Sequence, residues 1–192
     1  MKTFYIFRHG QSTYNLAGRT QGQTNDSVLT PLGEQQAREV GKKLQGRAVE
    51  VILSSPLTRA IQTARLANES LQVPMQIDDR FSEVNVGEIE GLHYTVIQEK
   101  YGMKYHKWRS SDRQYENMRF NGGESKKEVR TRVLEGLKDY AEHSPYTCMA
   151  VSSHGIMLTQ LLIAFDQRAI DVPNGGILEI TYDGTFAVQG WV

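Results

Sequence analysis

Apolar residues along the chain alternate between short runs and longer stripes, which predicts strands alternating with helices. Buried strands are predicted where the runs are nearly continuous, at Thr3–Phe7, Val49–Leu53 and Cys148–Ser152, with a shorter one at Met75–Ile77. Strands of this kind, separated by helices, favour an α/β protein with a largely parallel sheet. Towards the end of the chain, Gly176–Tyr182 and Thr185–Trp191 flank Asp183-Gly184, which predicts a hairpin.

Helix signals separate these runs. Thr30-Pro31 is typical of an N-cap followed by the first helical residue, and a stripe of apolar positions follows at Ala37, Val40, Gly41 and Leu44. Ser55-Pro56 predicts the start of a second helix, and Ser125–Glu128 has the pattern of a capping box that begins a third. Ile156–Phe165 is apolar enough to predict a buried helix.

Residues 93–122 differ from the rest of the chain. They place aromatic side chains, Trp108 among them, between many charged residues without a clear period. We expect this segment to form a small cap insertion over the sheet. The length of 192 residues, without repeats or linkers, predicts a single domain over residues 1–192.

Composition narrows the possible partners. Lys and Arg total 22, as do Asp and Glu, so the formal net charge is zero and no broad basic face for nucleic acid or for a membrane is expected. The single cysteine, Cys148, excludes an internal disulfide. No run approaches the roughly 20 apolar residues of a membrane span. We therefore expect a cytoplasmic protein and leave a homodimer open.

Three predicted strands lead into residues that suit phosphate binding. Arg8-His9-Gly10 ends the first strand, Ser54-Ser55-Pro56-Leu57-Thr58-Arg59 follows the second, and Ser153-His154-Gly155 follows the third. In an open parallel sheet, ligands bind outside the carboxyl ends of the strands. One such segment alone is usually structural or solvated, whereas three of them predict one pocket with two arginines and two histidines.

The chemistry of this pocket favours an anionic ligand. The planar guanidinium groups of its two arginines match phosphate oxygens in a bidentate way. Helix N-termini after Pro56 and near His154 are expected to add backbone N–H donors. Gly10 and Gly155 are expected to let the backbone approach the ligand closely. The sequence therefore predicts a phosphate site.

These three segments, with four others in the same order, resemble the signature of the histidine phosphatase superfamily, also called phosphoglycerate mutase-like. The matching segments cover most of the chain and are Arg8–Ser12 with Asn15, Gly18–Gly22, Leu29–Gly33, Ser54–Ala64, Glu83–Gly91, Gly122–Ser125 and Ser153–Gly155. The resemblance implies a three-layer α/β/α sandwich around a mostly parallel sheet, and an activity that needs no metal and no cofactor.

The resemblance also assigns roles. His9 is the expected nucleophile, which attacks phosphorus through one neutral ring nitrogen while a backbone carbonyl holds the other. Arg8, Arg59 and His154 are the expected clamp on the phosphoryl oxygens, where charge develops during transfer. Further phosphate or substrate contacts are expected from Asn15, Gln21 and Gly155.

Glu83 is the expected general acid, and after transfer the base that activates water. Glu88 and Glu90 compete for this role. We prefer Glu83 because the family's acid precedes a Gly-x-x-Glu-Gly motif by four residues, as Glu83 precedes Gly87.

Other polar residues receive more ordinary interpretations. Glu124 is expected to have a structural role beside the site. Surface or cap positions are expected for His93, His106 and His143. Three arginines of the 93–122 segment could bind a second anionic group on a substrate. The expected place of Arg109, Arg113 and Arg119 is nevertheless the solvated surface.

The resemblance leaves hydrolysis and mutase-type phosphoryl transfer to be weighed. Glycolytic mutases of this family carry a longer insertion, an extended tail and a Glu-Arg-His-Tyr-Gly run, where this chain has Glu83-Val84-Asn85-Val86-Gly87. These departures favour hydrolysis of a small phosphorylated metabolite. Two alternatives remain: a non-catalytic relative that binds phosphorylated ligands, and a metal centre built from His9, His154 and Glu83, which the adjacent arginines disfavour.

Overall fold

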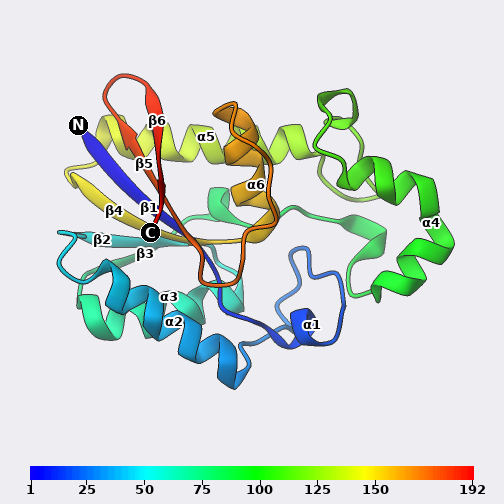
Figure 1. Ribbon diagram of the computed structural model, residues 1–192, viewed down its shortest axis with the longest axis horizontal. Helices are drawn as coiled ribbons and strands as arrows, with labels where there is room; N and C mark the ends of the chain where they lie inside the picture. The colour runs from blue at the N-terminus through cyan, green and yellow to red at the C-terminus, as the bar shows by residue number, and fades with distance from the viewer.

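A single six-stranded sheet forms the centre of the protein (Figure 1). The computed structural model describes all residues, Met1–Val192. The strands lie in the order β3-β2-β4-β1-β5-β6, and their bounds are β1 Lys2–Arg8, β2 Val51–Ser54, β3 Met75–Ile77, β4 Cys148–Ser153, β5 Ile177–Tyr182 and β6 Phe186–Trp191. The first four in this order pair in parallel, whereas the hairpin β5–β6 joins β1 in antiparallel fashion.

Helices cover both faces of the sheet, which confirms the three-layer α/β/α prediction. The main helices are α2 Pro31–Leu44, α3 Thr58–Leu71, α4 Tyr94–Arg109, α5 Lys126–His143 and α6 Gly155–Ala164, with a short α1 at Thr13–Leu16. Alternate residues of β1 show the two faces: Phe4 and Ile6 pack with α5 and α6, while Tyr5 and Phe7 pack with α2 and α3. In Figure 1, α5 and α6 lie above the sheet and α2 and α3 below it.

Several predicted boundaries shift in the structure. β2 begins at Val51 rather than Val49, and the helix expected to begin at Ser55-Pro56 begins at Thr58. Leu57 occupies the N-cap of α3 and makes no side-chain capping bond, so Ser55 is free for another partner. The capping box at Ser125 and the apolar stripe of α2 are present as predicted. None of the helices combines the length and apolar character that a membrane crossing needs.

Residues 93–122 contain more regular structure than their pattern indicates. They include α4 and a 3-10 turn at Arg113–Tyr115, and the helix is interrupted at Gly102, whose φ is 34°. This break explains the missing period, because the two halves of α4 do not share one continuous face. The segment lies beyond the carboxyl ends of the parallel strands, at the right of Figure 1. Its function as a cap stays a prediction.

A close approach of two backbone segments fixes the loop after β1 against the first turn of α2. A Cβ atom on Gly10 would lie 2.1 Å from the carbonyl oxygen of Gly33, and one on Gly33 would lie 2.0 Å from the carbonyl oxygen of Gln11. The expectation that Gly10 admits a ligand is therefore wrong, because the space beside it holds α2. This contact sets the path of the chain on either side of His9.

We predict that Gly33→Ala destabilises the protein by about 1–3 kcal/mol, because the added methyl group overlaps the backbone of Gln11. The sign of the change in unfolding free energy is informative, since Gly→Ala within a helix otherwise stabilises a protein by about 0.5–1 kcal/mol. Urea denaturation measures the change. Leu32→Ala is the matched control, since Leu32 is exposed in the same turn; equal stabilities of the two variants would contradict the close approach.

Candidate active site

The register of the parallel strands brings the three predicted segments to one edge of the sheet. Arg8 pairs with Ser153 across β1 and β4, and Ser54 pairs with Ser152 across β2 and β4. The residues that follow these pairs therefore emerge together. The rings of His9 and His154 lie 5.3 Å apart between centroids, inclined by 59°.

His9 is buried and held in one orientation. Its Nδ1 lies 2.7 Å from the carbonyl oxygen of Gly10, an acceptor, so Nδ1 carries the proton and Nε2 has a free lone pair. The expected backbone carbonyl is thus that of Gly10. The side chain of Asn174 donates to the carbonyl of His9 at 2.9 Å. Burial, with the charges of Arg59 and Arg8, holds the pKa of His9 well below its ordinary value.

His154 is fully buried and depends on Ser55 for its tautomer. Nε2 of His154 lies 2.8 Å from the Ser55 hydroxyl, which also accepts the backbone N–H of Leu57. The hydroxyl proton of Ser55 has no acceptor in the protein other than Nε2, so the imidazole proton is assigned to Nδ1, which has no partner in the protein. Burial and the charge of Arg59 hold the pKa of His154 well below its ordinary value.

The two arginines are partly committed to backbone carbonyls. Arg59, in the first turn of α3, donates to the carbonyls of Gly22 at 2.7 Å and Thr24 at 2.9 Å, and Arg8 donates to that of Val172 at 2.6 Å. The Nε atoms of both arginines are buried without a partner. Burial lowers the pKa of Arg59 to about 10 and also lowers that of Arg8, so both remain cations at neutral pH.

The N-terminus of α6 already has an anion, the carboxylate of Glu83. This carboxylate accepts backbone N–H groups from Ile156 at 3.0 Å, Met157 at 3.1 Å and Val84 at 3.0 Å. At α3, the N–H of Thr58 donates to the side chain of Asn25. The expectation that helix N-termini donate to phosphate is therefore wrong for these N–H groups, because side chains of the protein accept them.

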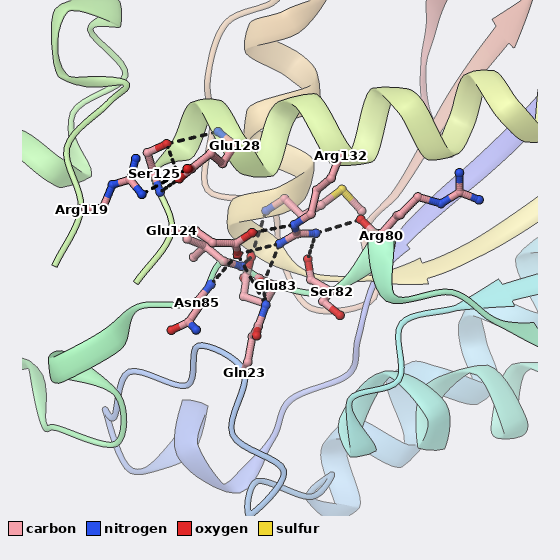
Figure 2. A network of polar contacts seen from close by, with 12 residues as sticks. Gln23, Arg80, Ser82, Glu83, Asn85, Arg119, Glu124, Ser125, Glu128 and Arg132 are labelled. Atoms are coloured by element: carbon pink, nitrogen blue, oxygen red, sulfur yellow. Dashed lines mark hydrogen bonds and ion pairs between the residues drawn. The ribbon is translucent and has the colours of Figure 1, made fainter. Parts of the chain in front are cut away.

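The loop that carries Glu83 is held from behind by a network around Arg132 (Figure 2). Arg132 extends from α5 and donates to the backbone carbonyls of Arg80 at 2.8 Å, Ser82 at 2.8 Å and Glu83 at 2.9 Å. The carboxylate of Glu124 pairs with Arg132 at 2.9 Å and accepts the N–H of Asn85 at 2.9 Å. The structural role expected for Glu124 is thus to hold this network.

A cavity of about 1050 Å³ opens above these groups. Among the site residues predicted from the sequence, the cavity is lined by Arg8, Asn15, Gln21, Glu83 and Gly155, while His9, Arg59 and His154 are buried and do not line it. A Cβ atom on Gly155 would lie 3.2 Å from Nε of Arg8, so this glycine makes room for the arginine. The predicted residues are thus gathered in one place.

Other predicted residues lie outside this group. Neither Glu88 nor Glu90 lines the cavity. Glu88 accepts the N–H of Asn121, and Glu90 accepts that of Gln23. The preference for Glu83 therefore has geometric support.

The remaining candidates are mostly exposed. His93 caps α4, His143 pairs with Asp139, and His106 is exposed at the cavity wall. Arg113 and Arg119 form ion pairs away from the cavity, whereas Arg109 lines it.

Several residues of the site escaped the sequence analysis. Ser55 stood within a quoted segment, but its contact with His154 depends on a register that the sequence does not show. Arg132 and Asn174 gave no signal, because each acts on a backbone carbonyl distant in sequence. The cavity wall also includes residues without a motif, namely Gln98, Glu99, Thr159 and Asp171.

The side chains do not form a metal centre. No group of three or more His, Cys, Asp or Glu residues has an arrangement that could hold a metal ion. The alternative of a centre built from His9, His154 and Glu83 therefore has no support in the geometry.

Sequence comparison finds relatives over nearly the whole chain. A protein of Hydrogenobacter thermophilus, provisionally named phosphoserine phosphatase 2, is 33% identical over 190 residues, which are 96% of this chain and 91% of that protein. A protein of Enterobacter sp. strain 638, provisionally named phosphoglycerate mutase GpmB, is 32% identical over 200 residues, 100% of this chain and 91% of that protein.

Solved structures have the same fold. Bacillus stearothermophilus YhfR is 28% identical with a TM-score of 0.88, and the match covers 99% of this chain and 96% of that one. A mycobacterial glucosyl-3-phosphoglycerate phosphatase, solved with VO3, has a TM-score of 0.87 at 22% identity, over 100% of this chain and 98% of that one.

The family comparison agrees with the geometry of the site. The model of the histidine phosphatase superfamily, branch 1, matches residues 4–189. Relatives of this kind support a phosphatase or a mutase activity. Strand ends that bring together two buried histidines and two arginines are what the resemblance implied, and the chain belongs to the histidine phosphatase superfamily.

Proposed function

We propose that the protein hydrolyses phosphomonoesters of small metabolites without a metal, through a phosphohistidine at His9. One observation carries the proposal. Nε of Arg8, Nε of Arg59 and Nδ1 of His154 are all buried without partners; the ring of His154 lies 5.3 Å from that of His9, and the charges of both arginines act on His9. Buried polar groups are nearly always satisfied, so three unsatisfied donors in one place imply an anionic ligand.

The first step transfers the phosphoryl group to His9. Nε2 of His9 attacks phosphorus, the ester bond breaks, and the leaving oxygen takes a proton. The neutral state of His9 keeps the lone pair on Nε2 available. The free donors of the two arginines and of His154 stabilise the charge on the phosphoryl oxygens, and one such donor contributes about 2.7–4 kcal/mol. Asn15, whose amide nitrogen donates to no protein group, and Gln21 line the space above.

Glu83 supplies the proton for the leaving oxygen. It is the one carboxyl group that both lines the cavity and is buried. Its two oxygens accept the backbone N–H groups of Ile156 and Met157, which fix the position of the carboxyl group at the cavity. After transfer, the carboxylate accepts a proton from water, whose oxygen attacks the phosphohistidine and releases phosphate.

The room in the site supports hydrolysis rather than mutase chemistry. The cavity of about 1050 Å³ is slightly larger than the usual range for small-molecule sites, about 300–1,000 Å³, so it has space for water beside a small leaving group. A mutase must keep water away from its phosphohistidine. The relative named as a phosphatase and the Val84-Asn85-Val86 run that follows Glu83 support the same choice.

We predict that phosphate release from a panel of phosphomonoesters persists in EDTA and disappears in His9→Ala, because the nucleophile is lost. Phosphate assay of the two proteins measures the difference. His143→Ala serves as the control, since His143 is exposed and far from the cavity lining. Release that survives in His9→Ala, or that stops with EDTA in the wild type, would contradict the proposal.

We predict that Glu83→Gln slows alkyl phosphates at least about tenfold more than p-nitrophenyl phosphate, because a nitrophenolate leaves without a proton and an alkoxide does not. The measurement is kcat/KM for both substrates in both proteins. Glu88→Gln is the control, since Glu88 does not line the cavity. Equal losses on the two substrates would remove Glu83 from the acid role.

The neutral histidines also predict a pH dependence of stability. The pKa of His154 is lower in the folded protein than the unfolded value of about 6.5, so the unfolded chain takes up the proton first as the pH falls. The contribution of each such histidine to the unfolding free energy is fully present above about pH 6.5. It is lost as the pH falls, with a slope of about 1.4 kcal/mol per pH unit.

We therefore expect His154→Gln to reduce the slope of the unfolding free energy against pH, between about pH 6.5 and 5, by about 1.4 kcal/mol per unit. Urea denaturation across this range measures the slope. His143→Gln is the control, since that side chain is 74% exposed. A slope unchanged by His154→Gln would show that the pKa of His154 is the same in the folded and unfolded protein, and would contradict the account.

A further inference from the structure

A second, smaller cavity of about 50 Å³ adjoins the main one. Five of its seven lining residues also line the main cavity, namely Trp108, Arg109, Ile156, Thr159 and Asp171. The two that belong to the small cavity alone are Lys126 and Gln160, at the N-terminus of α5 and within α6. A group on a molecule in the main cavity can therefore enter the small one.

Lys126 is a buried cation without an anion. Its residue is only 5% exposed, its ammonium group donates to the carbonyl of Ser110, and no carboxylate lies within ion-pair distance. Burial is the main cause of the lowered pKa of Lys126, and the charges of Arg109 and Arg130 act in the same direction. Burying an unpaired charge is costly, so a lysine in this state indicates a missing negative partner.

Two neutral hydrogen-bond donors in the lining also have no partner in the protein. The indole nitrogen of Trp108 is buried without a hydrogen bond, in a residue that is 3% exposed. Gln160, also 3% exposed, accepts from Arg130 through Oε1, and its Nε2 donates to no protein group. The small cavity is therefore lined by one cation and two donors that the protein leaves unsatisfied.

The only carboxylate in the lining does not compensate these donors. Asp171 pairs with Arg109 at 3.2 Å, and its side chain is 89% exposed. Arg109 is 44% exposed and lines both cavities. The pair thus lies on the solvent side, with the arginine beside the lysine.

We propose that this small cavity, the anion subsite (Lys126, Trp108 and Gln160, with Arg109 beside them), binds a carboxylate carried by the leaving group of the substrate. The volume admits roughly three waters, which suits a carboxylate better than a second phosphoryl group. The inference rests on the proposed function and narrows its substrate class to phosphomonoesters of hydroxy acids. Alcohols without a charge leave Lys126 unpaired and bind less well.

The test compares two ligands that differ in this one group, 3-phosphoglycerate and glycerol 3-phosphate. Each is measured as a competitor of p-nitrophenyl phosphate hydrolysis, and the readout is the ratio of the two inhibition constants. We expect the wild type to favour the carboxylate by about 10- to 100-fold, the range for a charge-assisted hydrogen bond. Lys126→Met and Trp108→Phe should each move the ratio towards one.

Lys127→Met is the matched control, because this neighbouring lysine is exposed and does not line either cavity; its ratio should equal that of the wild type. Trp108→Phe keeps an aromatic side chain and removes the N–H, so it tests the subsite even where Lys126→Met unfolds. A wild-type ratio near one, or a ratio that both variants preserve, overturns the subsite and leaves water as the occupant of the cavity.

Failure of the proposed function gives a different result. If the wild type releases phosphate from no phosphomonoester of the panel, hydrolysis is refuted, and calorimetric titration of the two ligands into the same proteins then measures the ratio directly. Preference for 3-phosphoglycerate that is lost in Lys126→Met and Trp108→Phe supports the subsite under either readout, and equal affinities overturn it.

Discussion

The burial of two neutral imidazoles beside two guanidinium cations is the constraint on which the rest of the structure depends. Arg8 and Arg59 remain charged, and both histidines stay unprotonated because protonation would add charge to a buried site that already holds two cations. Carboxylates act on these arginines, Glu83 on both and Glu90 on Arg59, but no carboxylate hydrogen-bonds the free donors of the cluster. The arrangement is therefore suited to a phosphoryl group, whose negative oxygens supply what the protein omits.

The fold holds this unfavourable cluster in place with backbone contacts. Strand register brings the three segments together, and Gly10 and Gly33 fix the chain beside His9. Carbonyl groups accept the remaining donors of the arginines, while Arg132 and Glu124 hold the loop of Glu83 against the N-terminus of α6. The N–H groups that do not position the arginines are thus the ones available to the ligand.

Much of this could be predicted from local sequence. The strands, the capped helices and the three segments at the strand ends have short-range signals, and the family resemblance gave the roles of His9 and Glu83. The kinked helix α4 could not be predicted from the sequence, because Gly102 interrupts its period. The contacts of Ser55 and Arg132 could not be predicted either, since each joins positions far apart in the chain. The expected use of helix N-termini failed because side chains of the protein accept those N–H groups, Glu83 at α6 and Asn25 at α3.

The central claim is that phosphate passes through His9. It is tested most directly by mixing the wild type with a phosphomonoester, quenching in alkali, where phosphohistidine is stable, and locating the phosphate by mass spectrometry of the peptides. The account predicts a phosphoryl group on His9 that appears and decays during turnover. Phosphate on another residue, or turnover without any phosphorylated peptide, would contradict it.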